Sequence, residues 1–168
     1  MKYFYILLAI LVTISSNAQD DTDSQTTTYY LIRHAEKDRS DATNRNPHLN
    51  EKGKQRALKW SNVFENIEFD LVYSTDYFRT KETAQPTAEK NHLEVTLYDP
   101  RDLNMKQFLE STKGKTVLIV GHSNTTPTFA NAILGKEKYS MIEDDNNANL
   151  YIITVTDSSI SDQLLVIE

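Results

Sequence analysis

Short runs of apolar, β-branched and aromatic residues alternate along this chain with longer segments in which apolar residues recur at helical spacing. The order is strand then helix four times, followed by two strands. This order predicts an α/β fold, a three-layer α/β/α sandwich around a mostly parallel central sheet. The predicted strands are residues 29–32, 69–73, 93–98, 116–120, 150–155 and 164–167, and the predicted helices are residues 50–65, 79–90, 105–111 and 127–134.

Several residues mark where these helices should begin, bend or end. Asn50 is a candidate N-cap for the first helix, and Thr125 or Thr126 is a candidate N-cap for the last. Gly135 directly follows the last helix and suits its C-terminal end. Pro86 lies inside the second helix, where a missing N–H and a steric clash predict a kink or a break.

The first residues are typical of a targeting segment rather than of a folded domain. Lys2 precedes an apolar run at residues 3–14, and Ser16-Asn17-Ala18 fits a signal-peptidase site. The alternative is a membrane anchor, but the run is shorter than the ~20 residues that a spanning helix needs. We expect a signal peptide at residues 1–18, a polar leader at 19–28, and one domain at 29–168. The protein is therefore expected to be secreted or periplasmic, with no stable membrane insertion after cleavage.

Composition excludes several classes of site. The chain has no cysteine, which removes thiolate zinc sites, iron–sulfur clusters, cysteine nucleophiles and attachment of lipid at a lipobox cysteine. The formal net charge of −6 argues against a nucleic-acid-binding protein. Zinc-type histidine spacings, a Gly-x-Ser-x-Gly elbow and a Gly-rich phosphate loop are also missing. We therefore expect neither a metal nor another cofactor.

Polar and charged residues follow the first four predicted strands directly. In α/β sheets, ligands bind beyond the carboxyl ends of the strands. Two arginines can grip a phosphate with several hydrogen bonds, and a histidine there can act as a nucleophile, a base or a donor. This set favours attack of a histidine on phosphorus in a small phosphorylated substrate. The residues that follow the strands are Arg33, His34, Glu36 and Lys37, then Ser74, Asp76 and Arg79, then Asp99 and Asp102, then His122 and Ser123.

Two other groups have simpler interpretations. His48 and His92 lie in polar stretches and are expected at the surface. The acidic segment 143–147 could attract calcium, but it lacks the alternation of an EF-hand loop, so we expect a solvated loop.

Four segments resemble motifs of the histidine phosphatase superfamily, in the branch with the cofactor-dependent phosphoglycerate mutases and the small phosphohistidine phosphatases. They occur in the family's order between residues 29 and 130. Ala35 stands where glycine is commoner in the family. The segments are Leu31-Ile32-Arg33-His34-Ala35-Glu36, residues 49–57 (LNEKGKQRA), residues 73–84 (YSTDYFRTKETA) and Gly121-His122-Ser123.

This resemblance implies a phosphoglycerate mutase-like fold and a role for each matched residue. His34 would be the nucleophile that becomes phosphohistidine. Arg33, Arg79 and His122 would bind the transferring phosphoryl group, with His122 adding hydrogen-bond donors.

The acid–base carboxylate of the family usually follows the third strand, which points to Asp99 or Asp102. Asp99 is preferred because it ends the strand directly. Lys37 and Ser123, close to the two histidines, are further candidates for substrate binding.

These observations favour a secreted, metal-independent phosphomonoesterase over two alternatives. A phosphomutase or phosphotransferase would have to shield its phosphoenzyme from water, and this chain lacks the long insertions of the mutases. A phosphate-binding module without turnover is disfavoured because both histidines and both arginines are present. The substrate pocket should be lined by loops such as residues 38–47 and 140–149.

Overall fold

The computed structural model describes residues 25–168, and its first strand, β1 (Thr27–Arg33), begins earlier than expected. The predicted signal peptide and the first part of the leader lie outside the described residues. The leader prediction was wrong at its end, because Thr27 and Thr28 already belong to the sheet. Both threonines form hydrogen bonds with the turn before β4. The N–H of Thr28 donates to the carbonyl of Lys115, and the N–H of Gly114 donates to the Thr27 hydroxyl.

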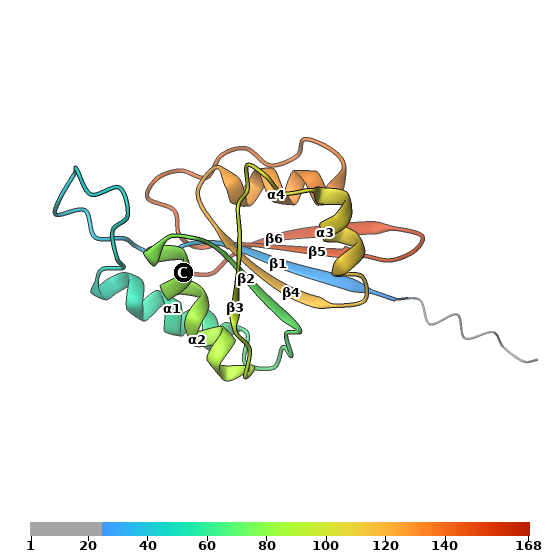
Figure 1. The fold of residues 1–168 in the computed structure, drawn as a ribbon, viewed down its shortest axis with the longest axis horizontal. Coiled ribbons are helices and arrows are strands. Elements are labelled where there is room, and N and C mark those ends of the chain that lie inside the picture. Colours follow the sequence, from blue (N-terminus) through green and yellow to red (C-terminus); the bar gives the residue numbers. More distant parts are fainter. Residues whose placement is uncertain (1–24) are drawn as a thin grey trace, which may run out of the picture.

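The elements follow the predicted order (Figure 1). The third predicted helix has the observed boundaries, and most others shift by one to three residues. After β1 they are α1 (Glu51–Val63), β2 (Leu71–Thr75), α2 (Phe78–Lys90), β3 (Val95–Tyr98), α3 (Met105–Ser111), β4 (Thr116–Gly121), α4 (Thr125–Leu134), β5 (Asn149–Val155) and β6 (Ile160–Val166).

One six-stranded sheet in the order β3-β2-β4-β1-β5-β6 forms the centre of the domain. Neighbours among β3, β2, β4 and β1 are parallel, whereas β5 is antiparallel to both β1 and β6. Five strands therefore point the same way and β5 alone is reversed. The expected mostly parallel sheet is confirmed, and the reversed strand places the segment before β5 beside the ends of β1 and β4.

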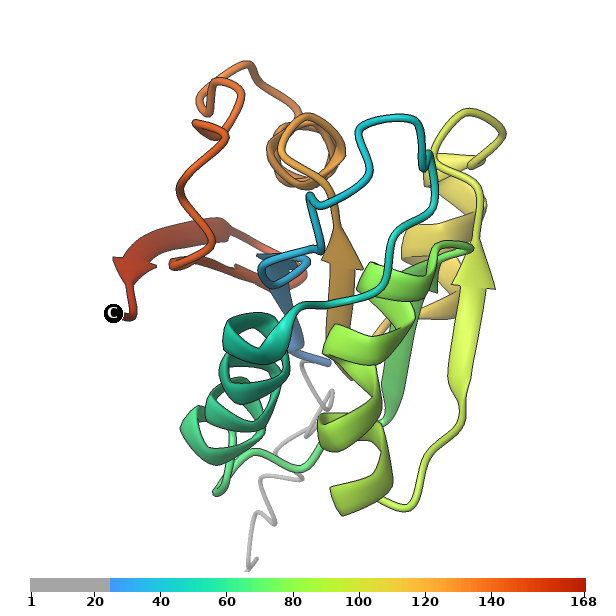
Figure 2. The same cartoon turned by 90° about the vertical axis from the view of Figure 1, so that its left-hand side faces the viewer.

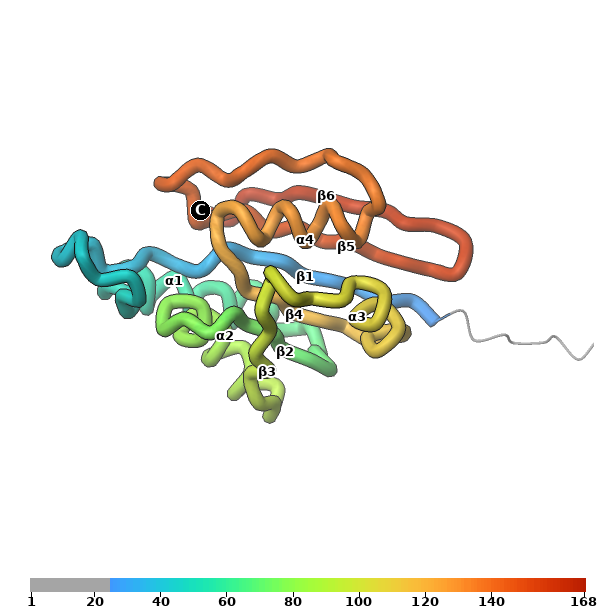
Figure 3. Tube along the Cα trace, turned by 45° about the horizontal axis from the view of Figure 1, so that its top comes forward, coloured from blue at the N-terminus to red at the C-terminus, as the bar shows by residue number. Residues whose placement is uncertain are grey.

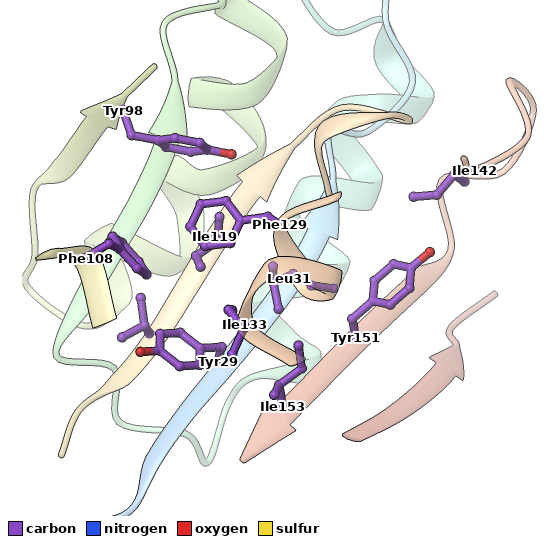
Figure 4. Close-up of a cluster of buried hydrophobic side chains, with 12 residues drawn as sticks. Tyr29, Leu31, Tyr98, Phe108, Ile119, Phe129, Ile133, Ile142, Tyr151 and Ile153 are labelled. Carbon is purple, nitrogen blue, oxygen red and sulfur yellow. The ribbon is translucent and has the colours of Figure 1, made fainter. Parts of the chain in front are cut away.

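Helices cover both faces of the sheet, as predicted for three layers. In Figure 2, α1 and α2 lie on one side of the sheet and α4 lies on the other. Successive side chains of the central strands point to opposite faces. Ile32 therefore packs with Trp60 of α1, whereas Leu31 packs with Phe129 and Ile133 of α4 in the cluster of Figure 4.

The helix ends agree with the sequence in part. Asn50 is the N-cap of α1, since its side chain accepts a hydrogen bond from the N–H of Gly53, and Gly135 ends α4 with a φ of 66°. Pro86 does not break α2, which is one helix from Phe78 to Lys90. The predicted caps of α4 were wrong: the cap position is Asn124, and Thr125 is the first helical residue, whose hydroxyl accepts from the N–H of His122.

Three connecting segments meet at the carboxyl ends of β1 and β4. Residues 34–50 follow β1, residues 122–124 follow β4, and residues 135–148 return to the start of β5 (Figure 3). This edge carries most of the predicted functional residues. Within residues 25–168, no helix is both long enough and apolar enough to cross a bilayer.

Candidate active site

The two predicted histidines lie together. Arg33 pairs with Gly121 across β1 and β4, so the residues that follow, His34 and His122, leave the sheet side by side. Their rings are 5.4 Å apart between centroids and nearly perpendicular, at 68°. The sequence prediction that strand ends bring both side chains to one edge is confirmed.

His34 is buried, and one of its ring nitrogens has a backbone hydrogen-bond partner. Its Nδ1 lies 2.7 Å from the carbonyl oxygen of Ala35, and a carbonyl can only accept, so Nδ1 carries the proton in the neutral ring. Nε2 is left with a lone pair. Burial, with the nearby charges of His122 and Arg33, lowers the pKa of His34 to about 3. At neutral pH this ring is uncharged, as a nucleophile must be.

The backbone around His34 is fixed from two sides. The N–H of Ala35 donates to the Thr83 hydroxyl of α2 (2.9 Å), and this hydroxyl donates to the carbonyl of Arg79 (2.6 Å). From the segment before β5, Nδ2 of Asn147 donates to the carbonyl of His34 (2.7 Å). The backbone of His34 is therefore tied to α2 and to the segment before β5.

Arg33 is buried and holds the acidic segment 143–147 against the end of β1. Its Nη1 donates to three carbonyl oxygens of this segment, and its Nη2 donates to the carboxylate of Asp144 (3.0 Å). Asp144 also pairs with Arg39 (2.9 Å), and these two arginines lower its pKa to about 2. Glu143, Asp144 and Asp145 are exposed, as expected of a solvated loop, but the backbone of the segment contacts the buried Arg33. The three carbonyls are those of Glu143 (2.8 Å), Asp144 (3.1 Å) and Asn146 (2.9 Å).

Arg79, in the first turn of α2, reaches His122 from the β2 side. Its Nη2 lies 3.4 Å from Nδ1 of His122, and its guanidinium carbon lies 4.4 Å from the centre of the Tyr77 ring. The Nε and Nη1 atoms of Arg79 and the Nε of Arg33 are buried without an acceptor among residues 25–168. Unpaired charged donors are costly, and an anion with several oxygens is the ligand that would satisfy them.

His122 is held by a hydroxyl on its other side. Its Nε2 lies 2.9 Å from the hydroxyl oxygen of Thr75, the last residue of β2. Burial and the charges of Arg79 and Arg33 lower its pKa to about 4, so the ring is neutral at physiological pH.

A cavity of about 180 Å³ opens beside His34, and Arg79 and His122 are not among the residues that line it. Lys37 faces it without an ion pair within the described chain, and burial and Arg39 lower the pKa of Lys37. Of the three carboxylates in the wall, Glu36 is bound by Arg56 and Lys52. All the lining residues are polar or charged: Arg33, His34, Glu36, Lys37, Arg39, Asn50, Asp144, Asp145 and Asn147.

The carboxylates expected after the third strand, Asp99 and Asp102, follow β3 (Val95–Tyr98). Asp99 is bound by Arg101 through both its oxygens, and this pairing lowers its pKa to about 2. Three strand spacings separate β3 from β1, roughly 14 Å. Within residues 25–168 no hydrogen bond or ion pair joins Asp99 or Asp102 to either site histidine.

Other predicted residues have simpler positions. Ser123 accepts a hydrogen bond from the N–H of Ile142 through its carbonyl, which anchors the chain after α4. His48 and His92 are at the surface, as expected; His48 stacks on Phe78 at 4.2 Å. In the part of the chain that the structure describes, no cluster of three or more His, Asp or Glu could hold a metal ion.

Comparison with known proteins extends these observations. A model of the histidine phosphatase superfamily (branch 1) matches residues 29–100. No curated protein matches the sequence.

Solved structures resemble the domain along nearly their whole length. A mycobacterial glucosyl-3-phosphoglycerate phosphatase has a TM-score of 0.65 at 15% identity, covering 84% of this chain and 98% of that one. A phosphoglycerate mutase from Bacillus anthracis has a TM-score of 0.64 at 17% identity, covering 86% and 95%. A phosphoserine phosphatase from Entamoeba histolytica, solved as an H9A mutant with phosphoserine, has a TM-score of 0.60 at 17% identity, covering 80% and 96%. At these identities the similarity shows the fold alone.

Proposed function

We propose that this chain, which has the sequence motifs and the fold of the histidine phosphatase superfamily, hydrolyses phosphomonoesters through a phosphohistidine on His34. One observation carries the proposal: a neutral, buried imidazole with a free Nε2 lies beside three guanidinium N–H groups that have no acceptor within residues 25–168. A phosphoryl group satisfies the donors and presents its phosphorus to the ring.

In the first step, Nε2 of His34 attacks phosphorus as the bond from phosphorus to the ester oxygen breaks. Nδ1 stays bonded to the carbonyl of Ala35, which supports the positive charge that the ring gains. Arg79, through Nε and Nη1, and Arg33, through Nε, hold the phosphoryl oxygens in both the ground state and the transition state.

The leaving oxygen needs a proton, and we assign its transfer to Asp145. Asp145 is the carboxylate of the cavity wall that forms no ion pair among the described residues, whereas Glu36 and Asp144 are both bound by cations. Asp99 is held ionised by Arg101, which disfavours it as an acid. Asp102, the other carboxylate implied by the family resemblance, is the alternative to test.

In the second step, water attacks the phosphohistidine and the bond from phosphorus to nitrogen breaks. The same carboxylate accepts the proton of the water, so that inorganic phosphate leaves and His34 is again neutral. The arginines supply the positive charge in both steps, and we propose that no metal is needed.

The cavity beside His34 supports a small, hydrophilic leaving group. Its volume of about 180 Å³ is below the ~300 Å³ of ordinary ligand pockets, and no apolar side chain lines it. Small phosphorylated alcohols such as sugar phosphates fit these properties better than nucleotides or phosphopeptides.

The N-terminal sequence supports export. We propose that residues 1–18 are removed as a signal peptide and that the enzyme acts outside the cytoplasm. The intact mass of the exported protein should correspond to a chain that begins at Gln19. Retention of residues 1–18 in a membrane fraction would replace secretion with anchoring.

A rapid-quench experiment tests the proposed reaction. With ³²P-labelled substrate, the wild-type protein should give an acid-labile, base-stable phosphoenzyme, and His34→Asn should give none. His92→Asn is the matched control, since His92 is an exposed histidine outside the site. A wild-type rate in His34→Asn would overturn the assignment of the nucleophile.

A further inference from the structure

Two buried threonines behind His122 form a chain of hydrogen bonds whose direction can be worked out. The Thr80 hydroxyl donates to the carbonyls of Thr75 (2.9 Å) and Tyr77 (3.0 Å). Its single proton is thus used, so toward Thr75 the Thr80 oxygen can only accept. The Thr75 hydroxyl donates to it over 3.0 Å.

The same proton count, together with the arginine beside Nδ1, favours one tautomer of His122. Because the Thr75 hydroxyl has given its proton to Thr80, its oxygen can only accept from Nε2 of His122, 2.9 Å away. Nε2 therefore carries the ring proton. In the neutral ring, Nδ1 has a lone pair, and it faces Nη2 of Arg79 at 3.4 Å.

All donors in this chain point the same way, from Arg79 through His122 and Thr75 to Thr80 and the backbone. Hydrogen bonds in one direction polarise one another, and the charged guanidinium at the start strengthens the effect. The opposite tautomer would turn an N–H of His122 toward the N–H of Arg79, and the two would repel.

We infer that Thr75 and Thr80 are positioning residues that hold His122 as the Nε2–H tautomer, so that Nδ1 orients Arg79 for the phosphoryl group. His122 then acts in the free protein as an acceptor for Arg79, not as a donor to the phosphoryl oxygens. Arg79 keeps Nε and Nη1, its two donors without a partner in the described chain, for the anion. The inference deepens the proposed function and rests on it for its catalytic meaning.

A purely structural role for the threonines would be a buried contact between the ends of β2 and α2. Both threonines are fully buried, so this contact exists in any case. The two roles differ in what a change does to the imidazole of His122 and to anion affinity, rather than to folding.

Thr75→Val tests the inference because it removes the hydroxyl and keeps the shape. We expect the dissociation constant of inorganic phosphate, measured by calorimetry, to rise roughly five- to tenfold, as for one lost hydrogen bond. Thr75→Ser should restore it. Thr87→Val is the matched control. Thr87, in α2, is buried as Thr75 is, and its hydroxyl has no hydrogen-bond partner among residues 25–168.

Nitrogen NMR of the His122 ring is the second measurement. At pH 7 the wild-type protein, free and with inorganic phosphate, should give one N–H, at Nε2. Thr80→Val frees the Thr75 hydroxyl to donate toward Nε2, so the Nδ1–H form should appear. The ring of His34 should keep its proton on Nδ1 in every variant.

Phosphate affinity in Thr75→Val equal to that in Thr87→Val would overturn the inference. An Nδ1–H or doubly protonated His122 in the wild-type protein would overturn it as well. Neither measurement needs turnover. A missing phosphoenzyme would therefore contradict the proposed function without deciding the tautomer, and a wrong tautomer would leave the hydrolysis intact.

Discussion

Nδ2 of Asn147 donates a 2.7 Å hydrogen bond to the carbonyl oxygen of His34, a residue 113 positions earlier in the chain. Asn147 is buried, and the residues before it enclose the guanidinium of Arg33. The segment before β5 thereby fixes the backbone of the proposed nucleophile.

Asn147→Ala should lower kcat/KM about tenfold, because it leaves a buried carbonyl unpaired and loosens the peptide that sets the direction of the His34 ring. Steady-state kinetics with an aryl phosphate would measure this loss. The control is Asn62→Ala, an exposed asparagine of α1, which should behave as the wild type. Equal rates in both variants would remove Asn147 from the site.

The two site histidines should make the protein less stable in acid. In the unfolded chain a histidine binds a proton below about pH 6.5, whereas His122 and His34 stay neutral in the fold down to about 4 and 3. The unfolded state binds more protons in this window, so the free energy of unfolding falls as pH falls from 6.5 toward 4. Two such groups contribute at most about 2.7 kcal/mol per pH unit.

Urea unfolding at pH 5 and pH 7 measures this dependence. The double variant His34→Asn, His122→Asn should lose much of it, because asparagine does not titrate. An unchanged pH dependence in that variant would show that these histidines have ordinary proton affinity in the fold.

Loss of the proton donor should depend on the leaving group. A nitrophenolate leaves with little help, whereas an alkoxide needs a proton in the transition state. Asp145→Asn should cost little with a nitrophenyl phosphate and 10²- to 10⁴-fold with an alkyl phosphate. Asp99→Asn and Asp102→Asn are the comparison, and selective loss in Asp102→Asn would place the donor after β3 instead.

Asp144→Asn should tighten the binding of inorganic phosphate severalfold. The Asp144 carboxylate neutralises part of the charge of Arg33 and Arg39, and the amide removes this competition without changing the shape. Calorimetry gives the affinity. The control is Asp157→Asn, which changes an exposed carboxylate paired with Lys113 at the opposite end of β5 and should leave the phosphate affinity unchanged. Weaker phosphate binding in Asp144→Asn would mean that the pairing of Asp144 with Arg33 is needed for the site.

Exhaustive treatment with a chelator should leave the rate unchanged, since the proposed reaction draws its positive charge from arginines. The rate before and after dialysis against EDTA measures this. Loss of activity that a divalent ion restores would give the acidic segment 143–147 a catalytic role.

The sequence predicted the fold class and the meeting of His34 with His122, because both depend on local patterns and on a general property of parallel strands. Its choice of Asp99 as the acid stays a prediction, since position along the chain shows neither the pairing of Asp99 with Arg101 nor the strand order that places β3 three strands from β1. Strand order depends on tertiary packing, which periodicity does not record.

The contacts of Thr75 and Asn147 were missed for a different reason. Thr75 follows the predicted strand 69–73 and was given no role, because a hydroxyl that fixes a tautomer leaves no mark in spacing. The pocket loop 140–149 was anticipated, but not that Asn147 and Asp144 bind the backbone of His34 and the side chain of Arg33. That arrangement follows from the reversal of β5, whose start lies beside the end of β1.

The reversal of β5 also places the proposed proton donor, Asp145, and the contacts to Arg33 and His34 in one segment outside the sheet. The segment before β5 can vary in length and composition without a change in the register of β1 or β4, provided that its contacts with Arg33 and His34 persist. Exchanging residues 135–142 between related domains, with residues 143–147 kept constant, would therefore change the surroundings of the cavity while the proposed nucleophile and proton donor stay in place, both in protein engineering and in divergence by natural insertion.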